Sequence, residues 1–349
     1  MTRSHVVSIA RLIENENGLK YPAPGNPKSG WEKEWFHVCV RARGVDLLVN
    51  LNVSADTRPA VPAGSRVARV VMMAHDRAWS GDVEPIDSRL VKLIPGEVAI
   101  RLGQNELVFR DGRFELNAAL QEYPLSVNAV LEPQTAPLGI THEVGLGEGA
   151  IGWFAIPRLS VTGHIVNGDH VYSLAGASGY LDHNWGRWLW GQDFSWEWGF
   201  GHLREGEEQW SLIVDRTLNR ARTRILESTF AVWRGETLVK IFSRNEISVR
   251  PIGFQFPLGI FRIPRPMALA VQELGRDVPR QYEVTARSGS DHVRLVLTTE
   301  NEAQILIPNE TDLDTTVITE VLGSVHMSGE IRGYRLDAEG GSVFEFLST

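Results

Sequence analysis

Residues 179–202 read Gly179-Tyr-Leu-Asp-His-Asn-Trp-Gly-Arg-Trp-Leu-Trp-Gly-Gln-Asp-Phe-Ser-Trp-Glu-Trp-Gly-Phe-Gly-His202. In the last nine residues, aromatic or imidazole side chains alternate strictly with small or acidic ones. Because successive side chains of a β-strand point to opposite faces, this alternation predicts a strand. Five of the chain's 11 tryptophans lie between Trp185 and Trp198. Such a density of flat side chains beside titratable groups suggests a pocket for a large apolar molecule.

Period-two alternation continues through most of the chain, and turn residues separate the alternating runs at short intervals. Trp35–Ala42 and Leu47–Ser54 form one such pair, joined by a turn that contains Gly44, and His170–Leu181 forms another run. Many short strands with hairpin signals predict an all-β protein. More than a dozen strands in 349 residues suit two tandem antiparallel barrels of roughly eight strands each.

Three segments interrupt the alternating pattern: a domain boundary, a helix candidate and a proline-rich stretch. We expect the domain boundary near Gly149–Arg158, where a glycine-rich segment precedes new strands, so the predicted domains are 1–155 and 156–349. Met267–Leu274 is the best helix candidate. The segment Pro251–Pro266 holds four prolines and three phenylalanines, so it cannot be a central strand. It is either a lid over a pocket mouth or a loop that packs its aromatic rings on a barrel wall.

Composition excludes several classes of protein. A net charge of −8 without a long basic run argues against nucleic acid as the partner. Cys39 is the single cysteine, which excludes an internal disulfide and a multi-cysteine metal site. No signal-peptide pattern and no run of about 18 apolar residues is present. We therefore expect a cytoplasmic protein whose ligand is a lipophilic small molecule; peripheral membrane contact and the oligomeric state stay open.

The alternating strand from Phe194 to His202 allows two functional interpretations. In the first, its aromatic face lines a cavity and stacks against an extended unsaturated ligand. In the second, that face packs against neighbouring structure, while the glycines of the other face leave room in a barrel lumen into which Glu197 projects. A plain aromatic core strand is the third interpretation. The aromatic face comprises Phe194, Trp196, Trp198, Phe200 and His202.

Asp182 is the first candidate for chemistry. It follows the predicted strand His170–Leu181, at a barrel rim where a carboxyl group can face both cavity and solvent. Trp185 and Trp188 would partly desolvate this carboxyl group, which raises its pKa and favours the protonated form. A protonated carboxyl group can donate its proton to an alkene, which is the first step of acid-catalysed addition. The alternative is structural, because Asp182 or Asn184 can also cap a turn by accepting backbone N–H bonds.

The first half of the chain also places polar groups at strand positions. Trp35, His37, Cys39 and Arg41 share one face of a predicted strand, and Asn50 and Asn52 share a face of the next. Most such residues are ordinary solvent-facing side chains. If some face a cavity, Arg41 could polarise a carbonyl group of the ligand.

Three motifs in order resemble the carotenoid 1,2-hydratase (hydroxyneurosporene synthase) and AttH-like superfamily. They are Arg158-Leu-Ser-Val-Thr-Gly163, the box Asp182-His-Asn-Trp-Gly186, and the tryptophan-rich strand that follows. Trp31-Glu-Lys-Glu-Trp-Phe36 resembles an N-terminal element of that superfamily but lacks its double tryptophan. The resemblance is specific in the middle of the chain and loose at both ends.

The resemblance implies two tandem lipocalin-like β-barrel domains, in agreement with the strand count. It leaves the reaction open, because the superfamily includes hydratases of isoprenoid alkenes and also resembles the decalin-forming Diels–Alderases. The ligand pocket would lie within one barrel or between the two. Neither a cofactor nor a metal ion is expected.

Three functions follow, in order of preference. The first is a cyclase that folds a polyketide or isoprenoid polyene into a reactive conformer, with Trp185, Trp196 and Trp198 shaping the chain. The second is a hydratase that protonates an alkene, whose cation the indole faces stabilise. The third is a non-catalytic carrier of a lipophilic ligand. The candidate catalytic residues are Asp182, His183, Glu197 and Arg41, and the candidate substrate-binding residues are Trp35, Asn184, Trp185, Trp188, Trp196, Trp198, Phe200 and His202.

Overall fold

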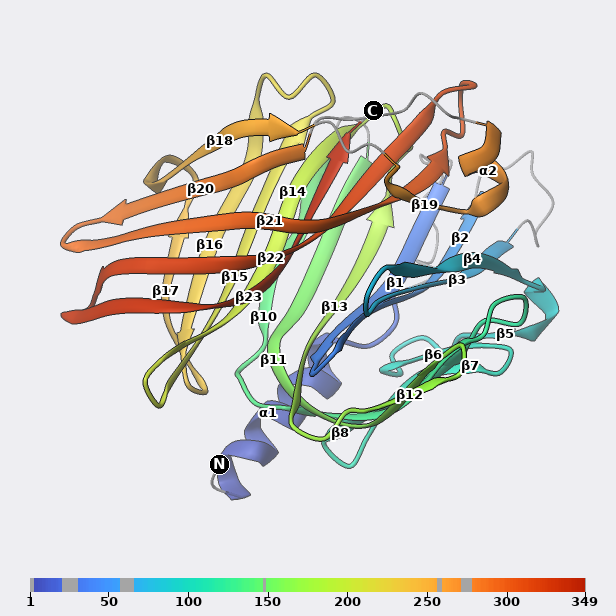
Figure 1. The fold of residues 1–349 in the computed structure, drawn as a ribbon, viewed down its shortest axis with the longest axis horizontal. Helices are drawn as coiled ribbons and strands as arrows, with labels where there is room; N and C mark the ends of the chain where they lie inside the picture. Colours follow the sequence, from blue (N-terminus) through green and yellow to red (C-terminus); the bar gives the residue numbers. More distant parts are fainter. Residues whose placement is uncertain are drawn as a thin grey trace. The chain divides into compact units, whose positions relative to one another are not determined.

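The computed structural model describes residues 3–20, 31–56, 66–146, 149–255, 259–270 and 278–348. The chain divides into two compact units, Met1–Leu189 and Trp190–Thr349, each built on one β-sheet (Figure 1). Within these described ranges, all strand pairs are antiparallel except β19 with β21. The prediction of an all-β chain with two tandem antiparallel domains is confirmed.

The first unit is a 13-stranded sheet with the order β4-β3-β2-β1-β13-β11-β9-β8-β7-β6-β5, where β10 and β12 also pair with β11. Its elements are α1 (Arg3–Glu16), β1 (Trp31–Ala42), β2 (Val45–Asp56), β3 (Arg66–His75), β4 (Trp79–Ile86), η1 (Ser88–Leu90), β5 (Val91–Lys92), β6 (Ala99–Leu102), β7 (Asn105–Arg110), β8 (Arg113–Ala119), β9 (Leu125–Pro133), β10 (Leu138–Leu146), β11 (Gly149–Asn167), β12 (His170–Ser173) and β13 (Ala177–Arg187).

The sheet of the first unit curls around one apolar core. The even-numbered residues of β1 pack with the odd-numbered residues of β2, for example Phe36 and Leu51. Strand β3 packs against β6, and β2 packs against β7, so distant parts of the sheet approach one another. The Glu84 carboxylate helps to hold this curvature, because it accepts the backbone N–H groups of Gln121 and Glu122 at 2.7 Å each.

The second unit is a 10-stranded sheet with the order β17-β16-β15-β14-β23-β22-β21-β20-β18, where β19 also pairs with β21, and it has its own apolar core. Its elements are β14 (Phe194–Glu205), β15 (Glu208–Asn219), β16 (Ile225–Arg234), β17 (Thr237–Ser243), η2 (Arg244–Glu246), β18 (Ile247–Gln255), β19 (Phe261–Ile263), α2 (Arg265–Ala270), β20 (Val278–Ser288), β21 (Asp291–Pro308), β22 (Thr315–Ile331) and β23 (Tyr334–Ser348).

The division between the units lies later than the sequence analysis placed it. Residues 149–158 belong to the long strand β11, which pairs with β9 and β13 inside the first unit. The glycines there are strand residues: a Cβ at Gly152 would lie 2.3 Å from the Trp185 ring. Glycine in this segment therefore marks close packing between neighbouring strands, and the division falls between Leu189 and Trp190.

The structure shows a short helix at the predicted helix position and an edge strand at the start of the proline-rich segment. Helix α2 covers the first half of the candidate Met267–Leu274, whose residues 271–274 lie outside the described ranges. Pro251 lies in β18, an edge strand, as its missing N–H requires. The sequence analysis did not predict α1, which buries Ile9 and Ile13 in the core of the first unit. No helix among the described residues has the length and apolar character needed to cross a membrane.

Candidate functional site

The box that begins at Asp182 is a strand rather than a turn. The predicted run His170–Leu181 breaks after Ser173, and β13 continues through Arg187 with β1 on one side and β11 on the other. Asp182 and Asn184 therefore point to the face of the sheet opposite the apolar core, while His183 and Trp185 point toward that core. The interpretation of Asp182 as a turn cap at a strand end was wrong.

His183 joins the N-terminal segment to the sheet. Its Nε2 lies 2.7 Å from Glu34 Oε1, and its Nδ1 lies 2.9 Å from the side-chain amide of Asn17. All three side chains are fully buried. The backbone N–H of Lys20 also donates to Glu34 at 2.7 Å, and Phe36 stacks on the imidazole ring with centroids 4.2 Å apart.

Burial lowers the pKa of His183, and the Glu34 carboxylate opposes that shift without overcoming it. A neutral ring that donates its Nε2–H to Glu34 has an accepting Nδ1. Turning the Asn17 amide by half a rotation lets its Nδ2, otherwise without a partner among the described residues, donate to Nδ1. The His183 group thus holds residues 17–20 against the sheet and leaves no ring nitrogen for a substrate.

The opposite side of the first sheet carries two rows of polar side chains. Register places Asn50, His37 and Asp182 in one row across β2, β1 and β13, and Asn52, Trp35 and Asn184 in the next. We call these six residues the polar face. Trp35 and the three asparagines are half-buried, and His37 and Asp182 are buried.

Hydrogen bonds fix the carboxylate of the polar face. Asp182 accepts the Tyr180 hydroxyl at 3.0 Å and the Asn184 amide N–H at 2.7 Å, one on each oxygen. His37 Nε2 lies 3.0 Å from the Cys39 sulfur, and burial lowers the His37 pKa to about 4, so the imidazole is neutral near pH 7. Both oxygens of Asp182 are therefore engaged within the sheet.

The two other candidates of the first unit lie beside this face. The Arg41 Nε donates to Asp46 Oδ1 at 2.9 Å, an ion pair across β1 and β2. The Trp188 indole is buried and meets the Trp35 ring edge-on, with centroids 5.2 Å apart. The Lys33 ammonium group lies 5.3 Å from the Trp188 ring and donates to the Trp188 carbonyl oxygen.

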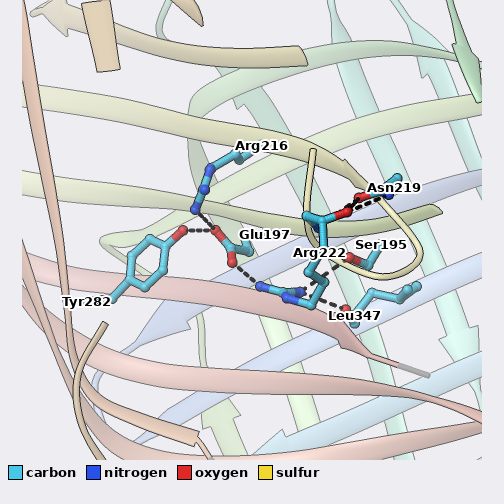
Figure 2. Close-up of polar contacts among 8 residues, drawn as sticks. Ser195, Glu197, Arg216, Asn219, Arg222, Tyr282 and Leu347 are labelled. Atoms are coloured by element: carbon cyan, nitrogen blue, oxygen red, sulfur yellow. Dashed lines mark hydrogen bonds and ion pairs between the residues drawn. The ribbon is translucent and has the colours of Figure 1, made fainter. Parts of the chain in front are cut away.

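In the second unit, Glu197 lies at the centre of a buried polar cluster (Figure 2). Arg216 Nη1 donates to Glu197 Oε2 at 2.7 Å, and the Tyr282 hydroxyl donates to the same oxygen. Arg222 donates to Oε1 and also reaches the Leu347 carbonyl oxygen at 3.2 Å. Two guanidinium groups and a phenol thus occupy both oxygens, which leaves Glu197 poorly placed to deliver a proton.

The glycines beside Glu197 do not open a lumen. A Cβ at Gly199 would lie 2.5 Å from the Phe344 ring, and one at Gly201 would lie 3.2 Å from Leu212 and Val325. These residues belong to the apolar core of the unit. The interpretation that the glycine face leaves room for a ligand was wrong, because core side chains fill that space.

The aromatic face of β14 lies beside three carboxyl groups that the sequence analysis did not select. Register places Glu320, Glu345, Trp198 and Asp215 in one row across β22, β23, β14 and β15. The indole N–H of Trp196 donates to Glu345 Oε1. We call these five residues the carboxyl–indole face. Phe200 and His202 continue along the same strand toward its end, and both are buried.

Burial raises the pKa of two carboxyl groups on the carboxyl–indole face. Carboxylate oxygens of Glu320 and Glu345 lie within 4.8 Å of one another. Burial raises the pKa of Glu345, and hydrogen bonds with Glu320 and Trp196 oppose that rise without overcoming it. Burial, helped by the Glu227 carboxylate, raises the pKa of the half-buried Asp215 to about 7. Two buried carboxyls side by side favour one shared proton; their oxygens are also ligands that a hard divalent cation prefers.

A signal for these carboxyls was present in the sequence. Glu345 interrupts a run of large apolar residues in Val-Phe-Glu345-Phe, and Asp215 ends one in Leu-Ile-Val-Asp215. A charged residue next to buried strand positions is rare without a partner or a task. Which acids are neighbours depends on strand order, and the sequence does not give that order.

Comparison of the structure with solved structures identifies the fold. An AttH-type protein from Nitrosomonas europaea superposes with a TM-score of 0.62 at 14% identity, covering 95% of this chain and 97% of that one. The chain therefore has the AttH fold. Kievitone hydratase from Nectria haematococca gives a TM-score of 0.57 at 10% identity, with 95% of each chain covered. CghA in complex with Sch210972 gives 0.55 at 11% identity, with coverage of 92% and 89%.

At these identities the likeness to the AttH fold concerns architecture, and it confirms the expected tandem lipocalin-like domains. No protein-family model and no curated protein sequence matches the chain. Structures with this fold include one named as a hydratase. Function must therefore be argued from the side chains of this chain.

Proposed function

We propose that the protein is an enzyme that adds water to an alkene of an apolar substrate by acid catalysis, without a cofactor. The observation that carries this proposal is the carboxyl–indole face, where a buried carboxyl pair, with the Glu345 pKa raised by burial, and a third carboxyl stand on either side of an indole. Hydration needs an acid, a cation-stabilising surface and a base, and this face offers all three. The hydratase was the second function expected from the sequence.

The proposed reaction starts at Glu345. Its O–H proton passes to one alkene carbon, the π electrons form the new C–H bond, and the neighbouring carbon becomes a cation. The Trp198 ring stabilises that cation by about 1–2 kcal/mol when water is excluded. A carboxyl pair that shares one proton suits this step, because burial raises the pKa of Glu345 and so favours its neutral, proton-donating form.

Asp215 completes the addition. A water molecule attacks the cation, the new C–O bond forms, and the Asp215 carboxylate accepts the proton that the water loses. Two interstrand intervals separate Glu345 from Asp215, about 10 Å at the backbone, and Trp198 lies between them, so the alkene would lie over the indole with an acid on each side. Asp215 then releases its proton to solvent and Glu345 takes one proton from solvent, so the net change is one water added to the substrate.

A cyclase of an apolar polyene is the second candidate. It is favoured by the row of aromatic rings along β14. The ring centroids of Trp196 and Phe194 lie 5.1 Å apart, and those of Trp198 and Phe200 lie 6.0 Å apart. Such a surface can hold a chain in one reactive conformer. A cyclase that works by shape alone would keep most of its rate without the Glu345 proton.

The experiment that separates these functions follows oxygen from water. The purified protein is incubated in oxygen-18 water, first with kievitone, because a hydratase of this fold is named for it, and then with extract from a strain that lacks the gene. A product heavier by one labelled water supports hydration. A product of unchanged mass and altered retention supports cyclisation, and binding without any product supports a carrier.

Three variants connect the result to the carboxyl–indole face. Glu345→Gln and Asp215→Asn are each expected to lower the rate of water addition at least 100-fold, as loss of a general acid or base does. Glu339→Gln is the matched control, because Glu339 lies exposed on the same strand as Glu345. Full water addition by Glu345→Gln would exclude this face as the site of proton transfer.

A further inference from the structure

We infer that the second unit docks on membranes that carry anionic lipids, through a surface formed by β18, β19 and α2. The partner is a bilayer with negatively charged headgroups. Docking does not depend on the proposed reaction, because it needs no substrate and no residue of the carboxyl–indole face. We call this surface the arginine–apolar surface, and its residues are Arg250, Ile252, Phe254, Arg262, Arg265 and Leu269.

Large apolar side chains of this surface lie in solvent. Leu269 is 77% exposed and Phe254 is 53% exposed. Val249 packs against the core of the unit, so Ile252, three residues further along β18, faces away from that core. Ile252 and Phe254 pair with residues two apart on β20 and therefore share this outer face. Side chains of this size gain free energy when they leave water.

The three elements of the surface meet along one stretch of β21. Gln255, at the end of β18, donates to Glu302 at 3.5 Å. Strand β19 pairs in parallel with residues 303–305, and α2 packs against β19, as Figure 1 shows. Phe254 and Leu269 therefore lie on elements that border the same part of β21, as two anchors of one surface must.

The charge of this surface matches an anionic membrane. The segment from Arg250 to Ala270 holds three arginines and no acidic residue, although the whole chain has a net charge of −8. On the neighbouring strands, Glu283 pairs with both Arg250 and Arg294, and burial raises the pKa of the half-buried Glu302. With Arg294, four arginines adjoin two carboxyl groups. Positive charge beside exposed apolar side chains is the combination that binds anionic lipid surfaces.

The strand order connects this surface to the proposed site. Phe261 of β19 pairs with Ala303 of β21, and Ala303 pairs with Glu320 of β22. Paired residues point to the same face of a sheet, so Phe261 continues the row that contains Glu345 and Trp198. Docking would therefore place the lipid phase at one end of that row. Supply of an apolar substrate from the membrane is the one consequence that rests on the proposed function.

Vesicle sedimentation tests the docking. The full chain is centrifuged with vesicles of equal parts phosphatidylcholine and phosphatidylglycerol, and with vesicles of phosphatidylcholine alone. We expect binding to the anionic vesicles to be at least about tenfold tighter, and Phe254→Ser/Leu269→Ser to weaken it at least about tenfold. Leu313→Ser/Val171→Ser is the matched control and should bind like the natural protein, because these side chains are 105% and 69% exposed outside the surface.

A fluorescent label gives a second, local readout. Cys39 is the single cysteine and is buried, so the cysteine of Leu269→Cys can be labelled selectively with the polarity-sensitive dye NBD. We expect the emission of this label to shift to shorter wavelength when the anionic vesicles are added. The same label on Leu313→Cys is the control, and its emission should stay unchanged. If the double serine variant does not fold, these two labelled proteins carry the test.

The results that would overturn the inference are distinct from those that concern the reaction. Absence of sedimentation with the anionic vesicles, equal sedimentation with neutral vesicles, equal losses in the two double variants, or no spectral shift at position 269 would each reject the docking. Sedimentation without water addition to any substrate would keep the docking and reject the proposed function. Water addition without sedimentation would do the reverse.

Discussion

Asp215→Asn should make the second unit more stable at neutral and alkaline pH. The folded protein raises the Asp215 pKa from 3.8 to about 7, about three units, and each unit corresponds to 1.36 kcal/mol. The folded state therefore binds a proton more tightly than the unfolded state between pH 4 and pH 7. Over that range stability falls as pH rises, by up to about 4 kcal/mol. An amide carries no charge and removes this loss.

Urea denaturation at pH 4.5, 6 and 8 measures the effect. We expect the two proteins to unfold at similar urea concentrations at pH 4.5, and Asp215→Asn to need increasingly more urea than the natural protein as pH rises to 8. Glu227→Gln should give a smaller change in the same direction, because Glu227 is the second cause of the shift. A difference between the proteins that stays constant from pH 4.5 to pH 8 would refute a proton-bearing Asp215.

Three further substitutions test other parts of the structure. Glu197→Gln should cost about 3 kcal/mol in urea denaturation because it leaves Arg216 without its buried partner; an unchanged stability with lost turnover would restore a catalytic Glu197. Gly199→Ala should cost about 1–3 kcal/mol because its Cβ meets the Phe344 ring, and an unchanged Tm would contradict that packing. In His183→Ala the fall in stability that the natural protein shows as pH drops below 6.5 should be absent, because that fall comes from the lowered pKa of His183 in the folded state. Thermal melts at pH 5 and pH 7 check this.

Local pattern was sufficient to predict the strands but not their partners. Alternation identified β1, β2 and β14 because side-chain parity is a property of each strand alone. The division between units was misplaced because glycines in β11 look like a linker until the Trp185 ring beside Gly152 is known. Helix α1 was missed for a similar reason, since its buried Ile9 and Ile13 have meaning only against the core that they cover.

The box at residues 182–186 shows how one strand can have two roles. Read as a list of polar types, Asp182, His183 and Asn184 look like one catalytic group. Parity separates them: His183 holds the N-terminal segment inside the first unit, and its two neighbours face the opposite side. A substitution at His183 is therefore expected to act through stability, and one at Asn184 through the polar face. Residues adjacent in sequence should be tested with different assays.

The acids selected from the sequence and those gathered by the fold differ because proton chemistry depends on cross-strand neighbours. Glu197 lies in the most conspicuous strand, yet two arginines on the neighbouring strand and its loop engage it. Glu345 and Asp215 lie in ordinary strands, and register places them on either side of Trp198. Burial without a cationic partner raises a carboxyl pKa, while burial beside guanidinium groups favours the charged form. In a β protein, the acid to test first is therefore the one whose cross-strand neighbours are indoles and other carboxyls.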